Sequence, residues 1–201
     1  MATRTVLLMA IASIYCLCNS ITTATAEEEV SKNALCDNYE RTLLMLKPDA
    51  VQRGLIGELI TRFERRGLQL VAMKFVLANQ AVAEDHYDDH KNKTIFPSLI
   101  KYMTSGPVVP MVWQGCDAIF LTRLMIGGHP QRVSSSRHLG FSLQANMKFA
   151  LPGTVRGDYA TRVDKNVIHA SDSVPAAERE IKIWFLEEEI VNWRSIIYDW
   201  I

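Results

Sequence analysis

Short apolar runs alternate with amphipathic stretches along most of the chain, and this alternation limits its fold more than any other feature. Residues 42–46 form an apolar run typical of a buried strand, which Lys47-Pro48-Asp49 ends. From Leu55 to Phe63 the apolar side chains recur every three or four residues, which predicts a helix that stops at Gly67. A strand followed by a helix therefore opens the predicted domain.

The same alternation continues towards the C-terminus. We expect further strands at 68–77, at 106–115 and in a short segment ending at His169, and helices at 81–90, 97–103 and 117–126. Ser173 is a suitable N-cap for a last helix, with Pro175 in its first turn. Strands and helices in this order predict an α+β sandwich in which helices pack against one sheet.

The size and charge of the chain restrict its class. Its 201 residues, 48% of them hydrophobic, suffice for one globular domain with its own core. The 22 basic and 22 acidic side chains cancel, so the net charge gives no support to a nucleic-acid binder or an anionic-membrane binder. The basic cluster at 62–66 is interpreted as the solvated face of a helix, with Glu58 and Arg62 spaced as an i,i+4 pair.

Residues 1–26 differ in character from the rest. Arg4 precedes an apolar run from Val6 to Cys18 that is too short to span a bilayer comfortably. Small polar residues follow and end in the A-x-A pattern at 24–26, which predicts a secretory signal peptide cut after Ala26. An uncleaved membrane anchor and an organelle transit peptide remain as alternatives, although transit peptides are richer in arginine.

The segment after the predicted signal, residues 27–39, is polar and aperiodic and is interpreted as a linker or arm. Removal of the signal would leave only Cys36 and Cys116, and two cysteines do not make a disulfide framework. The domain is therefore expected to be of an intracellular type that carries an export signal.

Several familiar sites are excluded by their motifs. The chain has no G-x-x-x-x-G-K-[ST] loop, no H-E-x-x-H and no C-x-x-C. His86 and His90 have helical i,i+4 spacing, but acidic residues surround them and the sequence marks no third ligand, so a solvated polar face is favoured over a metal site. What remains is a dispersed set of phosphate-type residues at the ends of elements: Lys47, Arg123, Arg156, Asn166 and His169. A polyphosphate site requires such groups to converge.

The pattern around these residues resembles one known family. The motifs that carry the resemblance are "ERTLLMLKPDAVQRGLIGELITRFERRGLQLVAMK", "HYDDHK", "YMTSGPVVPMVWQG", "PGTVRGDY" and "NVIHASDSVPAAEREIKIWF". Together they are similar to nucleoside diphosphate kinases over residues 40–201, with one interruption. The resemblance implies a ferredoxin-like sandwich, in which an antiparallel four-stranded sheet is covered by helices.

The resemblance also implies a reaction. A nucleoside triphosphate gives its terminal phosphoryl group to His169, and a different nucleoside diphosphate then collects it. Neutral imidazole suits this role because it has a free lone pair at neutral pH and needs no separate base. Glu180 would hold the imidazole in its attacking orientation and Ser171 would support it. Taken alone, His169 could equally be a structural histidine at a strand end, and Glu180 a surface charge on a helix.

The remaining implied roles concern the nucleotide. By the same resemblance, the nucleotide would contact Lys47, Tyr87, Ile95, Arg123, Arg156, Val163 and Asn166. The cations would clamp phosphates, Tyr87 would bond to the phosphoryl region, Asn166 with Lys47 would bind the ribose 3′-hydroxyl, and the base would lie against Val163. Asp172 would reach, through water, a Mg²⁺ ion carried on the phosphates. Relatives assemble as hexamers, which implies a homo-oligomer.

Three departures from the family pattern leave alternatives open. Ile95 stands where an aromatic ring usually stacks on the base, and the chain stops slightly early at Ile201. An insert at about 128–150 precedes "PGTVRGDY", so His129 takes the counted place of a phosphate-contacting threonine and an unusually long loop is expected. The insert is compatible with a lid, a partner-binding loop or sequence retained by mis-splicing. An active kinase is therefore weighed against a catalytically impaired relative that acts as a binding protein.

Overall fold

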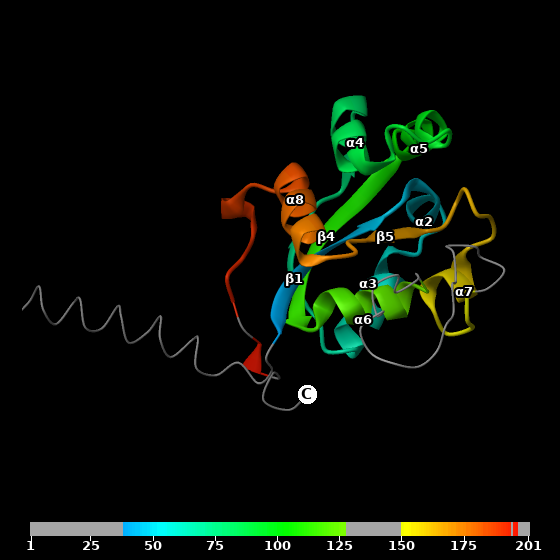
Figure 1. Ribbon diagram of the computed structural model, residues 1–201. Coiled ribbons are helices and arrows are strands. Elements are labelled where there is room, and N and C mark those ends of the chain that lie inside the picture. The colour runs from blue at the N-terminus through cyan, green and yellow to red at the C-terminus, as the bar shows by residue number, and fades with distance from the viewer. Residues whose placement is uncertain (1–37, 128–149, 194, 197–201) are drawn as a thin grey trace, which may run out of the picture. The chain divides into compact units, whose positions relative to one another are not determined.

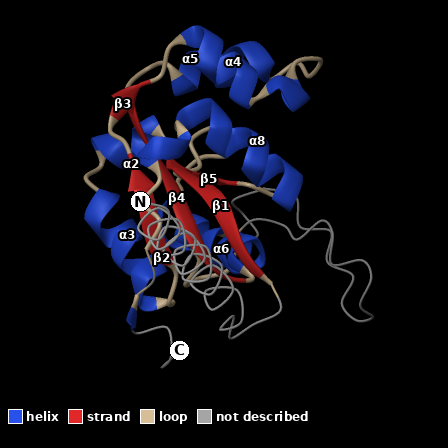
Figure 2. Ribbon diagram, turned by 90° about the vertical axis from the view of Figure 1, so that its left-hand side faces the viewer, coloured by secondary structure: helices blue, strands red, loops and turns tan. Residues whose placement is uncertain are grey.

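An antiparallel sheet of four strands forms the centre of the domain (Figure 2). Its strands are β1 (Tyr39–Leu46), β2 (Gln69–Met73), β4 (Pro107–Cys116) and β5 (Ile168–Ala170), and they lie in the order β2-β4-β1-β5. A two-residue strand, β3 (Val76–Leu77), also pairs with β4. The computed structural model describes residues 38–127, 150–193 and 195–196. The expected antiparallel sheet covered by helices is confirmed.

Helices cover both faces of this sheet (Figure 1). One layer contains α3 (Ile56–Arg65), α6 (Ala118–Ile126) and α7 (Val155–Tyr159), and the other contains α4 (Gln80–His86), α5 (Phe96–Met103) and α8 (Val174–Trp184). A short helix, α2 (Pro48–Gln52), follows β1, and 3₁₀ turns lie at η1 (Asp88–His90) and η3 (Glu187–Glu189).

The alternation of side chains along β1 divides the core into two halves. Leu44 and Leu46 pack beneath α3 and α6, whereas Leu43 and Met45 pack beneath α4 and α8, and all four are fully buried. A central strand with both faces covered needs an unbroken apolar run, which is what residues 42–46 supply. His169 lies opposite Met45 in the register of β5 with β1, so its side chain points towards α4 and α8.

The elements differ from the sequence expectations at several places, and α2 is one of them. β1 begins at Tyr39, inside the predicted arm, and Asn38 O accepts a bond from Asp117 N–H at 2.8 Å. The strand expected at 68–77 is split, because it reaches Pro110 of β4, which has no N–H to donate to the ladder. The helix expected at 81–90 ends at His86 and continues as η1, and α7 was not predicted.

The described ranges leave out several segments that the sequence singles out. Of the four cysteines, only Cys116 lies within the described residues. Within the described ranges, no helix has the length and apolarity needed to cross a membrane. The predicted signal peptide, the arm up to residue 37 and the insert up to residue 149 also lie outside the described residues.

Candidate active site

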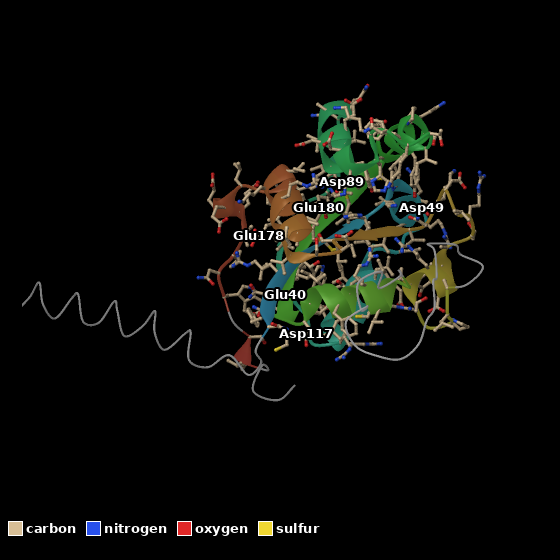
Figure 3. All side chains as sticks on the ribbon, in the orientation of Figure 1. Glu40, Asp49, Asp89, Asp117, Glu178 and Glu180 are labelled. Carbon is tan, nitrogen blue, oxygen red and sulfur yellow. The ribbon has the colours of Figure 1, made fainter. Side chains whose placement is uncertain are left out.

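His169 is held by a carboxylate on α8. The Nε2 atom of His169 lies 2.8 Å from Oε2 of Glu180, and the Ser171 hydroxyl donates to the same oxygen at 2.7 Å. α8 begins directly after β5 because Ser173 caps it, accepting from the Ala176 N–H at 3.4 Å, and this places Glu180 two turns into the helix. Glu180 is buried rather than a surface charge, and Figure 3 shows it on α8 above the sheet.

The charge of Glu180 fixes the tautomer of His169. Burial acts to raise the pKa of Glu180, but the charge and hydrogen bond of His169, with smaller contributions from His86 and Ser171, hold it at about 2. An ionised carboxylate only accepts hydrogen bonds, so the proton of the His169 ring resides on Nε2. The other ring nitrogen, Nδ1, therefore carries the lone pair.

His86 lies beside these two residues, and the prediction that it belongs to a solvated polar face is wrong. It is 2% exposed, and its ring meets that of His169 edge to face at a centroid distance of 4.5 Å. The expected i,i+4 face is lost because the α-helix ends at His86 and His90 follows in a 3₁₀ turn. His86 therefore helps to fix the ring of His169 by direct packing.

The side chains of His86, His169 and Glu180 are close enough to suggest a metal site. One ligand atom from each lies within 4.8 Å of the others. However, the indole N–H of Trp184 donates to Nδ1 of His86 at 3.2 Å, which places the ring proton of the neutral histidine on Nε2. Nδ1 of His86 thus accepts from Trp184, whereas Nε2 carries the ring proton and is buried without a hydrogen-bond partner among the described residues. A metal ion would require the opposite tautomer and would lose the bond from Trp184, so a metal does not fit this cluster.

Three cations converge on β5 around His169. Arg156 donates to the carbonyl of Ile168 at 2.9 Å, and Arg123 donates to the carbonyl of Ala170 at 3.3 Å. β5 is an edge strand, so these carbonyls need donors from outside the sheet. Lys47 follows β1 and donates to Oδ1 of Asn166 at 2.7 Å. Residues that are far apart in the sequence therefore surround one histidine.

Burial of these cations prepares the site for an anion. Burial, followed by the charge of Arg156, lowers the pKa of Lys47 to about 7 despite the opposing charge of Asp49. Burial and the charge of Arg123 similarly lower the pKa of Arg156 to about 10, and burial lowers the pKa of Arg123. Positive groups that are desolvated and crowded together are destabilised in the empty site. A bound polyphosphate supplies the missing counter-charge and so stabilises them.

The other predicted site residues divide into two groups. Tyr87 is buried, with its ring 5.9 Å from that of His169, and Asp172 follows Ser171 at the exposed start of α8. Ile95 and Val163 are more than half exposed, and neither joins the hydrogen bonds around His169. Their exposed apolar surfaces suit contact with a base but do not themselves mark a pocket.

Sequence reasoning missed two residues that contact this site besides His86. Asp49 accepts the backbone N–H of Val167 at 3.2 Å, and Tyr102 donates to the same carboxylate. The only signal in the sequence was the position of Asp49 directly after Lys47-Pro48. Periodicity cannot reveal a contact between residues that are 118 positions apart in the sequence.

Comparison with known proteins agrees with this geometry. The family model described as nucleoside diphosphate kinase matches residues 40–190. The human nucleoside diphosphate kinase B is 46% identical over 164 residues, which cover 82% of this chain and 97% of that protein. Among solved structures, the Halobacterium salinarum nucleoside diphosphate kinase in complex with CDP is similar with a TM-score of 0.71 and 39% identity, covering 81% and 98% of the two chains. The family protein from Babesia bovis gives 0.70 and 38%, covering 80% and 98%.

Proposed function

The chain belongs to the nucleoside diphosphate kinase family, and from this premise we propose that its phosphoryl transfer proceeds through a covalent phosphate on His169. The overall reaction moves the terminal phosphoryl group from a nucleoside triphosphate to a nucleoside diphosphate. The observation that carries the proposed route is the bond between Nε2 of His169 and Glu180, which leaves the lone pair on Nδ1.

The two half-reactions follow from that tautomer. The lone pair of Nδ1 attacks the terminal phosphorus, the bond from phosphorus to the bridging oxygen breaks, and its electron pair leaves on the diphosphate. The ring then carries a positive charge with its proton on Nε2, which the Glu180 carboxylate stabilises. A terminal oxygen of the second diphosphate reverses these steps, and the ring returns to its neutral state without transfer of a proton to bulk water.

Side chains around His169 bind the nucleotide in this proposal. Lys47, Arg123 and Arg156 contact the phosphates and offset the charge that develops during transfer. Asn166, with Lys47, binds the ribose 3′-hydroxyl, and Tyr87 lines the phosphoryl site. The base lies between the exposed apolar side chains of Ile95 and Val163. Few polar groups contact the base, so several bases are accepted.

Mg²⁺ is the proposed cofactor, and Asp172 would hold it through water. A single exposed carboxylate beside Arg123 suits an ion that keeps most of its water and is carried by the substrate phosphates, whereas it would not suffice for a tight protein-only site. When bound, the ion neutralises phosphate charge and helps to orient the terminal phosphoryl group.

Labelling tests the covalent route directly. The protein is incubated with γ-labelled nucleoside triphosphate, freed of nucleotide and then given a diphosphate with a different base. We expect a protein-bound phosphate that is labile in acid and stable in alkali, and its complete transfer to the second diphosphate. A folded protein that takes no label would instead support the alternative of an impaired relative that acts as a binding protein.

Export through the secretory pathway is a second part of the proposal. The signal-like pattern of residues 1–26 carries this part of the proposal. Export would expose the sequon Asn92-Lys93-Thr94 to glycosylation, and all three residues are exposed. A glycan there would stand next to Ile95 and would obstruct entry of the nucleotide. An anchored or organelle-targeted chain is the alternative.

Mass spectrometry of protein from a secreting eukaryotic cell tests export. We expect a mature chain that begins at Glu27 and carries a glycan on Asn92, which Asn92→Gln removes. A chain that still carries Met1 would refute cleavage, and an unmodified Asn92 would refute only the glycan.

Native mass spectrometry of the same sample measures the number of subunits in the proposed homo-oligomer, for which the family resemblance favours a hexamer. Exposed apolar side chains at Met73, Phe75 and Leu77 support self-association.

A further inference from the structure

The backbone is strained two residues before His169. Val167 has φ of +71°, a left-handed conformation that β-branched residues rarely adopt. The N–H of Ile168 bonds to the carbonyl of Asn166 at 2.8 Å, so the three residues form a γ-turn with a positive central φ, which is the rare and strained form. Such strain persists only where surrounding contacts impose it, and it occurs most often at functional sites.

The Asp49 side chain is hydrogen-bonded to this turn. Its Oδ2 atom accepts the N–H of Val167 at 3.2 Å, and its Oδ1 atom accepts the hydroxyl of Tyr102 from α5. The carbonyl of Val167 is held in turn by the N–H of Lys47 at 2.9 Å. Figure 3 shows Asp49 on α2, near the point where β5 begins. Both carboxylate oxygens of Asp49 therefore accept hydrogen bonds from groups outside α2, and they link α2 to the turn before β5 and to α5.

The turn determines where the neighbouring groups of the site lie. Asn166 immediately precedes Val167, and its side chain reaches Lys47 at 2.7 Å. The carbonyl of Asn166 accepts Arg156 at 3.4 Å. If Val167 relaxed to a negative φ, the peptide before it would rotate, and Asn166 would no longer meet both cations.

We propose that Asp49, supported by Tyr102, is a positioning residue that holds Val167 in the left-handed conformation and so presents Asn166 and Lys47 to the nucleotide. This inference rests on the nucleotide-binding roles proposed above for Asn166 and Lys47. Asp49 acts through the backbone and not by contact with the reacting atoms. The negative charge of Asp49 also opposes the loss of the Lys47 proton.

A substitution cycle at the strained residue tests the idea. Asp49→Ala removes the hold, and we expect KM for nucleoside diphosphate to rise about tenfold while kcat falls less. Adding Val167→Gly should restore KM to within about threefold of the wild-type value, because glycine adopts a positive φ without steric cost. Adding Val167→Ala instead should restore nothing, because alanine removes most of the same side chain but keeps the steric penalty.

Thermal melting separates this role from a purely structural one. Val167 is fully buried, so both substitutions at this position should lower Tm further even where Val167→Gly restores KM. Recovery by the alanine variant as well as by the glycine variant, or by neither, would overturn the proposal. If Asp49→Ala does not fold, Tyr102→Phe provides the test, since it removes the hydroxyl that holds the Asp49 carboxylate and leaves the charge of Asp49 in place. We expect a rise in KM of a few fold that Val167→Gly removes and Val167→Ala does not, and an unchanged KM would overturn the proposal.

The labelling reaction distinguishes failure of the proposed function from failure of the proposed role of Asp49. Wild-type protein that takes no phosphate would defeat the proposed function itself. Wild-type protein that is labelled normally, while Asp49→Ala leaves KM unchanged, would defeat only the role of Asp49.

Discussion

His169→Ala should lower phosphoryl transfer by at least about a thousandfold, because the variant lacks the nitrogen that is proposed to receive the phosphate. The fold should survive, since His169 is partly exposed and the rest of β5 is unchanged. Steady-state transfer between two nucleotides and thermal melting measure the two effects. His90→Ala is a matched control, because His90 is a half-buried histidine of the same region that is outside the proposed machinery.

The structure also predicts which nitrogen of the His169 ring carries the phosphate. Because Glu180 holds the proton on Nε2, the label should be found on Nδ1. Alkaline hydrolysis of labelled protein and comparison with standards of both phosphohistidine isomers decides this. Phosphate on Nε2 would contradict the assigned tautomer, and turnover by His169→Ala comparable to that of His90→Ala would contradict the covalent route itself.

The features that could be predicted from the sequence are those encoded by neighbouring residues. The helical stripe from Leu55 to Phe63, the cap at Ser173 and the apolar run of β1 depend on local spacing, and the structure contains each of them. The resemblance identified His169, Glu180 and the cations by their motifs, and the structure brings these residues together.

The features that could not be predicted depend on contacts between distant segments. His86 was assigned to a polar face because acidic residues flank it, yet the bond from Trp184 and the ring of His169 bury it. The positive φ of Val167 has no signal in its own residue type, since valine disfavours that conformation. It becomes understandable only when Asp49 is seen to hold the N–H of Val167.

Binding of nucleotide should weaken as the pH rises through about 7, because Lys47 then loses its proton. Its pKa is lowered to about 7 by burial and by Arg156, and Asp49 offsets this only in part. Between about pH 6 and 8 the protonated fraction falls from nine-tenths to one-tenth, so KM should rise roughly tenfold. Bound phosphates favour the charged amine, so kcat should change less than KM.

Lys47→Met tests this assignment, because methionine fills the buried space without a charge. We expect kcat/KM to fall by at least about a hundredfold and the pH step in KM to disappear. Lys101→Met, at an exposed position on α5, should retain both the activity and the pH step. Steady-state kinetics at several pH values with saturating Mg²⁺ compares the three proteins. A step that persists in Lys47→Met would assign the titration to another group.

Loss of the Lys47 proton at high pH, which weakens nucleotide binding, should stabilise the folded protein. The pKa of Lys47 in the folded protein is below the value of 10.5 for a solvated lysine, so between about pH 7 and 10.5 the unfolded chain binds more protons than the folded chain. The contribution of Lys47 to the free energy of unfolding therefore increases as the pH rises across this window. Below the window the amine is charged and its burial destabilises the folded protein.

Urea unfolding of wild type and Lys47→Met isolates that contribution. The difference between their unfolding free energies should favour the wild type more at pH 9 than at pH 6, while its nucleotide affinity is lower at pH 9. An anion site built from a desolvated lysine has this property, because the unfavourable burial of the charge that destabilises the empty protein is relieved when the phosphates bind.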